Sequence, residues 1–355
     1  MTIAARRRAR LRVAVLAMAA MALAGCAASS DAAPVPIATT VPPAPSPTAT
    51  VEPAPEAPQT VPHPLRGTAV PAGGVAGPAL SAKIDNHPAA RPQVGLERAD
   101  VVFEELVEGG LTRYVAVWSS DIPDEIGPVR SIRPMDPDIV EPLGGVIAYS
   151  GGQQRFVDMM LATSVHNAIH GGADDRFMHR TSGKAAPHNV IVSARELVQA
   201  YAQIPAPAPQ FAFTSMPVAA SAAAYGRSSA GFDLSFSPRQ SRQWQWDAGS
   251  GGYLRGQNGA ADTDPSGAPL SATNVVVVAV DIDWAYGEIP RTVMIGSGAA
   301  WIATGGKVLE ATWTKPSREA PLQLTNAHGV AIHLAPGATW VELVPTGSGG
   351  SVSVR

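Results

Sequence analysis

The 355-residue sequence contains a single cysteine, Cys26, so it can form no disulfide within the chain. A metal site built from several cysteine thiolates is excluded for the same reason. Any folded part must therefore depend on its apolar core, which a hydrophobic content of 45% can supply. Lysine is also scarce, so arginine carries most of the positive charge. Arginine suits fixed pairing with carboxylates or phosphates, but it is equally typical of a GC-rich coding sequence.

The first 25 residues have the composition of a secretory signal. Five arginines and no acid come first, and the stretch from Val13 to Gly25 carries no charge. This apolar run is too short to span a bilayer, which needs about 20 residues. The tetrapeptide 23–26 resembles the bacterial lipobox, in which the cysteine accepts a diacylglycerol. We therefore expect a signal peptide at 1–25 and lipid attachment at Cys26. An ordinary secretory signal is the alternative, and Arg6-Arg7 leaves the choice between general and twin-arginine export open.

A lipid on Cys26 would tether the chain to the bilayer, on the extracytoplasmic face of the cell membrane. Removal of residues 1–25 takes away five arginines, so the net charge falls from −3 to −8. Such a surface is a poor partner for nucleic acid, and we expect none to bind.

Residues 26–78 have the composition of a stalk. Eleven of the 33 prolines lie between Pro34 and Pro64, and no lysine or arginine occurs between Arg12 and Arg66. Proline at this density favours an extended polyproline conformation, so the sequence predicts a disordered, semi-rigid stalk without a packed core.

The folded part is predicted to be α+β. A mixed α/β first domain is expected at 79–205, with helices near 135–143, 153–162 and 193–202. A linker at 206–230 and a mainly β second domain at 231–347 follow. The second domain is predicted from repeated short apolar runs with turn residues between them. These runs lie at 232–236, 242–246, 274–280, 291–295, 301–303, 308–314, 330–334 and 339–344.

A β-hairpin in the first domain carries the first candidate residues. Two apolar runs flank Gly109-Gly110, which predicts a two-residue turn. In that register Glu104, Glu108 and Arg113 share one face of the hairpin. Charges on strands that are apolar on both faces are costly unless they are paired. The three residues therefore form either a structural ion pair or a polar pocket at the strand ends.

Arg130 and Arg133 flank Ser131 and are the second set of candidates. The proline after Arg133 favours an extended conformation there. Two guanidinium groups in such a segment can form an anion cradle, or they can pair with acids of the same domain. The sequence leaves both roles open.

Histidines between residues 166 and 188 form the third set. His166 and His170 have the spacing of one helix face, but Gly171-Gly172 would end such a helix. The spacing matches no metal motif, so we predict neither metal nor cofactor, with a zinc site as the open alternative. His170 and His188 either contact a ligand or bond to backbone and carboxylate groups.

Other recognisable sites are absent from the sequence. It has no phosphate loop, no Gly-x-Ser-x-Gly elbow and no Ser-x-x-Lys motif of the penicillin-binding kind. Trp244, Trp246, Tyr253 and Trp284 could stack against sugars, but their places in predicted strands favour packing of the second domain.

Several separate motifs resemble the YerB-like bacterial lipoproteins, a two-domain family of unknown function. The motifs are Lys83-Ile84-Asp85-Asn86, 91–96, 99–104, Glu108-Gly109-Gly110, 127–133, 186–189, 274–277, 313–317 and 336–340. Phe103 and Ile132 depart from the family pattern without affecting a charged candidate. The resemblance covers about residues 80–345 and implies two adjoining domains on an envelope lipoprotein, but no activity.

We expect a non-catalytic envelope lipoprotein that binds cell-wall material or a wall-synthesis protein through Arg113, Arg130 and Arg133. The alternative is a wall-polymer hydrolase or transferase with Glu104 or Glu108 as acid/base, assisted by His170 or His188. Solute capture for a transporter is a third hypothesis, which the lack of helices in the second domain disfavours.

Overall fold

The computed structural model describes residues 59–355. The predicted signal peptide, the lipid site at Cys26 and the stalk up to residue 58 lie outside the described residues. Residues 59–78, which were expected to belong to the stalk, are folded. Two short strands pair there in antiparallel fashion, and Leu65 is buried in the same apolar core as Val101. The spacer interpretation therefore does not hold for residues 59–78.

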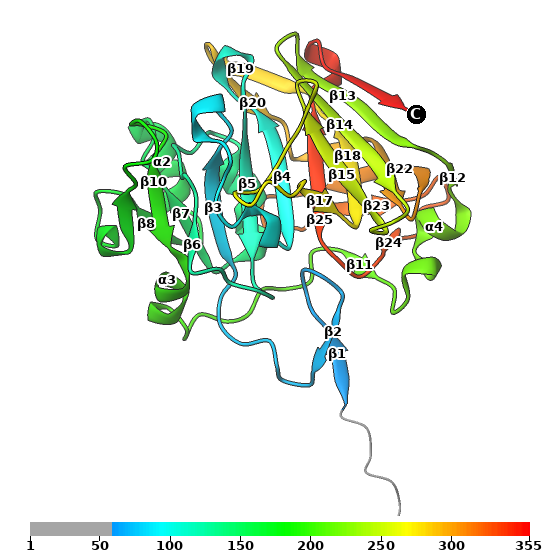
Figure 1. Ribbon diagram of the computed structural model, residues 1–355, viewed down its shortest axis with the longest axis horizontal. Coiled ribbons are helices and arrows are strands. Elements are labelled where there is room, and N and C mark those ends of the chain that lie inside the picture. The colour runs from blue at the N-terminus through cyan, green and yellow to red at the C-terminus, as the bar shows by residue number, and fades with distance from the viewer. Residues whose placement is uncertain (1–58) are drawn as a thin grey trace, which may run out of the picture. The chain divides into compact units, whose positions relative to one another are not determined.

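One sheet of eleven strands runs through both halves of the sequence (Figure 1). Its strands, in spatial order, are β12 (Arg227–Ser228), β22 (Lys307–Lys315), β21 (Gly296–Thr304), β18 (Asn274–Ala279), β25 (Thr339–Val344), β4 (Val101–Leu106), β5 (Thr112–Trp118), β3 (Leu80–Asp85), β7 (Val146–Tyr149) and β8 (His166–Ile169), with β23 (Gln323–Thr325) beside β22. Strand β25 pairs in parallel with both β4 and β18. Strands β4 and β25 are buried on both faces, as expected in the middle of a covered sheet, although β4 carries two glutamates and β25 one.

A second sheet of six strands covers one face of the first. It consists of β16 (Ala260–Ala261), β15 (Gly252–Gln257), β14 (Gln240–Asp247), β13 (Gly231–Ser237) and β26 (Ser351–Val354), with β17 (Ser271–Ala272) beside β15. Alternate residues of β14 are buried, so one face of this sheet meets the core. Trp244 and Phe232 pack there in one cluster with Val102, Val275 and Trp340.

The other face of the large sheet packs against a second core, to which helices of the first half and segments of the second half both contribute. Helix α1 (Asp136–Val140) with the turn η4 (Glu141–Leu143), and α2 (Gln154–Leu161), contribute Ile139, Leu143 and Phe156 to this second core. Helix α3 (Ala194–Ala200) packs with the first core through Leu197.

Short elements complete the described chain. The strand pairs and small sheets are β1 (Thr60–Pro62) with β2 (Ala69–Pro71), β6 (Glu125–Ile126) with β10 (Val190–Ser193) and β9 (Met178–Arg180), β11 (Ala212–Phe213) with β24 (His333–Leu334), and β19 (Ile282–Tyr286) with β20 (Ile289–Thr292). The remaining helical turns are η1 (Pro88–Ala90), η2 (Leu96–Arg98), η3 (Glu108–Gly110), η5 (Asp175–Phe177), η6 (Pro217–Ala219), α4 (Ser221–Tyr225) and η7 (Thr346–Ser348).

The element types agree with the sequence prediction in most places. Helices are present where they were expected near 135–143, 153–162 and 193–202, and strands dominate from Gly231 onward. His166 and His170 lie on and just after strand β8, so the helical spacing between them has no structural meaning.

The β4–β5 hairpin has a different register from the predicted one. Its loop is the three-residue turn η3, in which Gly109 and Gly110 have φ values of 71° and 70°. A loop of three residues shifts the pairing by one position relative to a two-residue turn, and Glu105 therefore stands opposite Arg113. Glu104 lies on the opposite face of the sheet from Arg113, so the prediction of a shared face is wrong.

Candidate functional site

Nine ionisable side chains meet where β3 ends, and we call this group the Arg130 cluster. Its members are Lys83, Asp85, Glu105, Glu108, Arg113, Arg130, Arg133, Asp136 and His188. Five of the seven residues predicted from the sequence are thus brought together. Glu104 and His170 are not among them.

The backbone of residues 128–130 places Arg130 in the cluster. The Arg130 N–H donates to the Lys83 carbonyl oxygen at 2.8 Å, and the Asp85 N–H donates to the Pro128 carbonyl oxygen at 2.9 Å. Position 127 is glycine, which lets the same segment also lie against β10. Gly127 has a φ of +143°, and a Cβ there would be 2.9 Å from the Val190 carbonyl oxygen.

Lys83 occupies the buried centre of the cluster. Its Nζ donates to Asp136 Oδ1 at 2.7 Å and also contacts Glu105. Burial lowers the pKa of Lys83 to about 8, and the Asp136 carboxylate opposes this shift. The second Asp136 oxygen accepts the Arg133 backbone N–H at 2.6 Å. Both acids are therefore engaged with partners inside the protein.

Arg133 and Glu108 form a pair of their own. Arg133 Nε donates to Glu108 Oε2 at 2.6 Å, its Nη2 contacts the other carboxylate oxygen, and Nη1 donates to the Ile132 carbonyl at 2.7 Å. Burial alone would raise the pKa of Glu108, but Arg133 brings it to about 2. The bidentate pairing indicates a structural role for Arg133.

Arg113 and Arg130 are the less satisfied cations of the cluster. The buried Arg113 donates through Nη1 to the Ser131 carbonyl at 2.6 Å, and its contact with Glu108 is longer, at 3.8 Å. Burial and the Arg133 guanidinium lower the pKa of Arg113 to about 10, and Arg130 acts in the same direction. Three guanidinium groups therefore lie close together here, and the carboxylates of Glu108 and Asp85 oppose the shift.

The Arg130 guanidinium is the most accessible of the three arginines. Its side chain is 21% exposed, and Nε lies 3.3 Å from Asp85 Oδ2. Within residues 59–355 its side-chain nitrogens make no hydrogen bond. Planar guanidinium nitrogens without partners can bind a carboxylate or a phosphate in bidentate fashion.

His188 lies beside Arg130 through a shared carboxylate. His188 Nδ1 is 2.6 Å from Asp85 Oδ2, the same oxygen that faces Arg130. The His188 ring stacks on His87 with centroids 4.2 Å apart and an interplanar angle of 13°. Asp85 thus fixes the ring orientation of His188, and the other ring nitrogen is left for a ligand contact.

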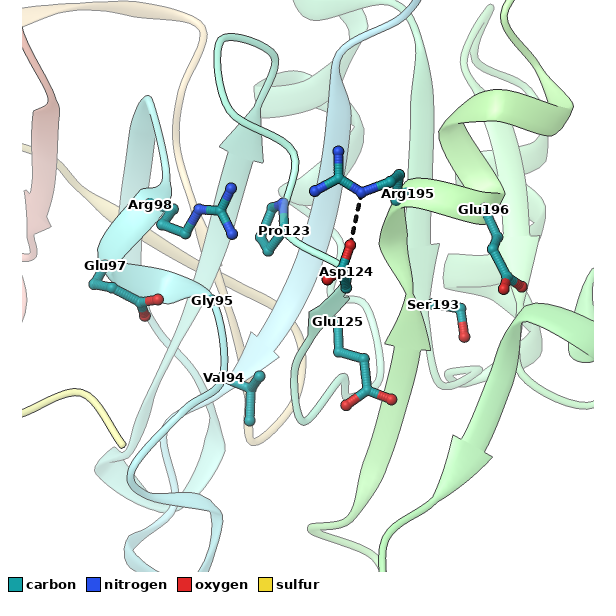
Figure 2. Close-up of a pocket in the computed structure, with 10 residues that line it drawn as sticks. All are labelled: Val94, Gly95, Glu97, Arg98, Pro123, Asp124, Glu125, Ser193, Arg195 and Glu196. Carbon is teal, nitrogen blue, oxygen red and sulfur yellow. Dashed lines mark hydrogen bonds and ion pairs between the residues drawn. The ribbon is translucent and has the colours of Figure 1, made fainter. Parts of the chain in front are cut away.

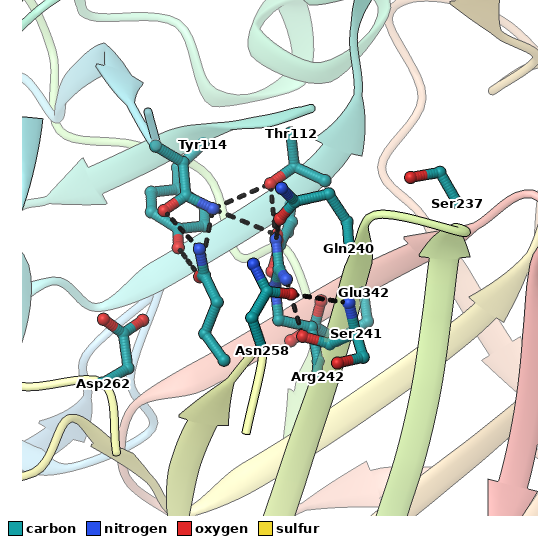
Figure 3. A network of polar contacts seen from close by, with 12 residues as sticks. Thr112, Tyr114, Ser237, Gln240, Ser241, Arg242, Asn258, Asp262 and Glu342 are labelled. Carbon is teal, nitrogen blue, oxygen red and sulfur yellow. Dashed lines mark hydrogen bonds and ion pairs between the residues drawn. The ribbon is translucent and has the colours of Figure 1, made fainter. Parts of the chain in front are cut away.

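Glu104 belongs to a different group, buried between the two sheets. We call it the intersheet network, which comprises Glu104, Arg242, Arg255, Asp262 and Glu342. Figure 3 shows Arg242, Asp262 and Glu342 of this network. Arg242 Nε donates to Glu104 Oε1 at 2.7 Å, and Arg255 contacts the other oxygen. Burial alone would raise the pKa of Glu104, but the two arginines lower it to about 2. A carboxylate that is fully buried and held in this way cannot reach an external polymer.

Glu342 is the second acid of the intersheet network. It accepts a hydrogen bond from Trp244 Nε1 at 2.7 Å. Burial and the nearby Glu104 carboxylate raise the pKa of Glu342 to about 8. Glu342 is therefore neutral at neutral pH, and the two acids hold opposite ionisation states in one network.

The remaining histidines lie apart from the Arg130 cluster. His170 Nδ1 is 2.7 Å from Asp175 Oδ1, and His166 Nε2 is 2.8 Å from Asp174 Oδ2. No three histidine or acidic side chains come together as a metal site in the part of the chain that the structure describes. Of the two roles expected for His170, the structure shows the contact with a carboxylate, that of Asp175.

A surface pocket of about 580 Å³ lies elsewhere, between residues 94–98, 123–125 and 193–196 (Figure 2). Four acids line it, namely Glu97, Asp124, Glu125 and Glu196, together with two arginines. Arg195 Nε donates to Asp124 Oδ1 at 2.6 Å. None of the predicted site residues lines it, and its acidic lining does not suit an anionic ligand.

The aromatic candidates of the second half are mainly packing residues. Trp244 and Tyr253 are fully buried in the core between the sheets. Trp284 is half exposed on β19. Packing, rather than sugar stacking, is what the structure assigns to Trp244 and Tyr253.

Two domain families of unknown function match this chain. The model described as "Protein of unknown function (DUF3048) N-terminal domain" matches residues 67–206, and the corresponding C-terminal domain matches residues 232–341. The chain belongs to the YerB-like two-domain family. The resemblance found in the sequence motifs is thereby confirmed.

The YerB-like relatives give a family and a fold without an activity. The chain is 25% identical over 279 residues to "Putative lipoprotein YerB" of Bacillus subtilis (strain 168), covering 76% of this chain and 82% of that protein. The crystal structure of YerB from Bacillus subtilis matches with a TM-score of 0.70 at 20% identity, covering 82% of this chain and 99% of that one. In residues 59–355, no helix is long and apolar enough to cross a bilayer.

The candidate site residues predicted from the sequence do not include four buried members of the Arg130 cluster in this YerB-like chain. They are Lys83, Asp85, Glu105 and Asp136. A signal was present in the strand 80–85, where Lys83 and Asp85 alternate with apolar residues and so share one face. Such charges on a covered strand require partners, and the hairpin and the 127–136 segment supply them.

Proposed function

We propose that this chain is a cell-envelope lipoprotein, anchored by a lipid on Cys26 at the extracytoplasmic face of the membrane. Its folded part is a non-catalytic binding factor for cell-wall polymer, and Arg130 receives an anionic group of that polymer. The kinship with YerB supports the lipoprotein part of this proposal. The chemistry of the Arg130 cluster supports the binding part.

The observation that carries the binding proposal is the state of Arg130. The acids of the cluster are engaged by Lys83, Arg133 and His188, whereas the accessible guanidinium of Arg130 has no hydrogen bond among the described residues. The buried Arg113 adds positive charge behind it. A carboxylate or phosphate placed on Arg130 would complete its hydrogen bonding and offset that charge.

Cosedimentation with purified cell-wall sacculi tests this proposal. The mature chain with Cys26→Ser, which lacks the proposed lipid-attachment site, is mixed with sacculi, and the sacculi are then pelleted. Charge-assisted hydrogen bonds contribute about 1.5–3 kcal/mol each, so Arg130→Ala should weaken binding about tenfold or more. Arg239→Ala removes an exposed arginine elsewhere and should bind like the parent chain. Equal binding of Arg130→Ala and Arg239→Ala would overturn the proposal.

The same mixture also tests the rival hydrolase or transferase. The buried Glu104 is not available as its acid/base, but the Asp85–His188 pair has the geometry of an oriented base. Release of soluble wall fragments that is lost in His188→Ala would establish catalysis in place of simple binding. If the chain binds a wall-synthesis protein instead of the polymer, it should not pellet with purified sacculi.

A further inference from the structure

Exposed apolar side chains gather on one part of the described chain. Across residues 59–355, eight large apolar residues are exposed: Val61, Leu161, Met216, Val218, Tyr225, Trp284, Ile295 and Val330. Five of them, Val61, Met216, Val218, Tyr225 and Val330, come from β1, the 211–225 segment and the loop before β24. Val218 and Tyr225 are 76% and 82% exposed. We call these five residues, with the hollows between them, the apolar face.

Three connected hollows make the apolar face continuous. The first, of about 510 Å³, lies between the β1–β2 pair and residues 213–217. The second, of about 380 Å³, includes Tyr225 and Val330 and shares Thr214 with the first. The third, of about 290 Å³, shares Ala331 and Ile332 with the second. Figure 1 shows β1, β2, β11, β24 and α4 on the same side of the molecule.

The apolar face carries no formal charge. None of the described residues that line the three hollows is an aspartate, glutamate, lysine or arginine. The sequence has no such residue in 197–226 or in 320–341. A contiguous apolar surface of this kind marks a contact site, whereas single exposed residues such as Leu161 and Trp284 need no explanation.

Part of the apolar face, at β1, lies close in sequence to Cys26, the proposed site of lipid attachment. The described chain begins at Gln59 and enters β1, whose Thr60, Val61 and Pro62 line the first hollow. Only 32 residues separate Gln59 from Cys26, a span of about 110 Å at full extension. A tether this short gives the nearby bilayer a high effective concentration, so a weak contact is enough.

We propose that the apolar face lies on the outer surface of the bilayer, at the boundary between headgroups and acyl chains. The proposal rests on the lipid attachment proposed above. The chain without residues 1–25 has a net charge of −8, so the uncharged face is the part that an anionic bilayer repels least. Tyr225, with an apolar ring and a polar hydroxyl, suits this boundary. This orientation turns the tethered molecule so that one fixed side meets the membrane.

Vesicle flotation tests the membrane contact without the lipid anchor. The mature chain with Cys26→Ser is mixed with vesicles of phosphatidylglycerol and phosphatidylcholine and floated through a density gradient. We expect the chain to float with the vesicles, and the double substitution Val218→Glu and Tyr225→Glu to reduce the floated fraction at least fivefold. Leu161→Glu with Trp284→Glu, which also charges two exposed apolar positions, should float like the parent chain.

Two results would overturn the membrane contact. The first is a floated fraction that is the same for the two double variants. The second is a chain that does not float but elutes as a dimer, which Val218→Glu with Tyr225→Glu converts to a monomer; a second copy would then cover the face. Metabolic labelling of Cys26 with palmitate tests lipid attachment separately, so failure of the anchor and failure of the contact are distinguishable.

Discussion

At the scale of single residues, Glu104 connects the two halves of the protein. It lies on β4 and pairs with Arg242 and Arg255, which are 138 and 151 residues further along the chain. Removal of one partner from a buried pair leaves uncompensated charge, which costs about 3–5 kcal/mol. We expect Glu104→Gln to lower the free energy of unfolding by that amount in urea titrations. Glu310→Gln, at an exposed position, should change it by less than about 0.5 kcal/mol. Equal effects of the two substitutions would contradict the network.

Glu342 gives the intersheet network a pH dependence. Its folded pKa of about 8 lies above the ordinary value of 4.5, because it is buried beside Glu104. Between these two values the unfolded chain releases a proton that the folded chain keeps, so stability falls as the pH rises from 4.5 to 8. Glu342→Gln keeps the neutral form and should remove this part of the fall, on the order of 2–4 kcal/mol. Urea midpoints at pH 5, 6, 7 and 8 measure it, and identical slopes in both chains would disprove the assignment.

At the scale of elements, glycines with positive φ let strands approach one another. Gly145 precedes β7 with a φ of +73°, and a Cβ there would lie 2.2 Å from the Ala79 carbonyl oxygen. Gly109 in the β4–β5 loop has a similar φ of +71° but open space around it. Gly109→Ala should therefore cost about 1 kcal/mol from backbone conformation alone. Gly145→Ala adds a clash with backbone and should cost more than about 3 kcal/mol. Thermal unfolding of both variants measures the difference, and equal losses would contradict the close approach.

The same hairpin shows what sequence reasoning can and cannot supply. Its two strands were predictable because β-branched and aromatic residues flank a glycine pair. Its register was not, because Gly109-Gly110 fits a two-residue turn as well as the three-residue loop that forms. A shift of one position exchanges the faces of every residue, so Glu104 was assigned to the Arg130 cluster and Glu105 was overlooked. The predicted register was therefore wrong because the loop is one residue longer than predicted, whereas the two strands were predicted correctly.

Long-range partners were beyond the reach of the sequence. The apolar run at 339–344 was recognisable as a strand, but nothing local shows that it pairs with β4 and β18 in parallel. Likewise, nothing local shows that Arg242 and Arg255 pair with Glu104, because that contact forms only when the two sheets pack together. Arg130 could be predicted as a candidate because two arginines in one extended segment can form an anion cradle, although the sequence left their pairing with acids of the domain equally open.

At the scale of the whole molecule, β25 joins strands of the two sequence halves into one sheet, because it pairs with both β4 and β18. The strand pairs with β4 of the first half, and the intersheet network holds the second sheet over the same place. We therefore expect residues 59–355 to unfold in one cooperative step. Tryptophan fluorescence, which reports Trp118 in the first half and Trp244 and Trp340 in the second, should coincide with far-ultraviolet circular dichroism in urea. Two separate transitions would show that the halves fold independently.

The central claim is that Arg130 receives an anionic group of the cell wall. Calorimetric titration of the soluble Cys26→Ser chain with solubilised wall fragments tests it most directly, in the parent chain, in Arg130→Lys and in Arg130→Ala. The only partner of the Arg130 side chain among the described residues is Asp85, which His188 also contacts, so neither substitution should lower the free energy of unfolding by more than about 1 kcal/mol. We predict that the dissociation constant rises about tenfold or more in Arg130→Ala and by less in Arg130→Lys, which keeps the charge but not the bidentate geometry. The same dissociation constant in all three chains would contradict the account.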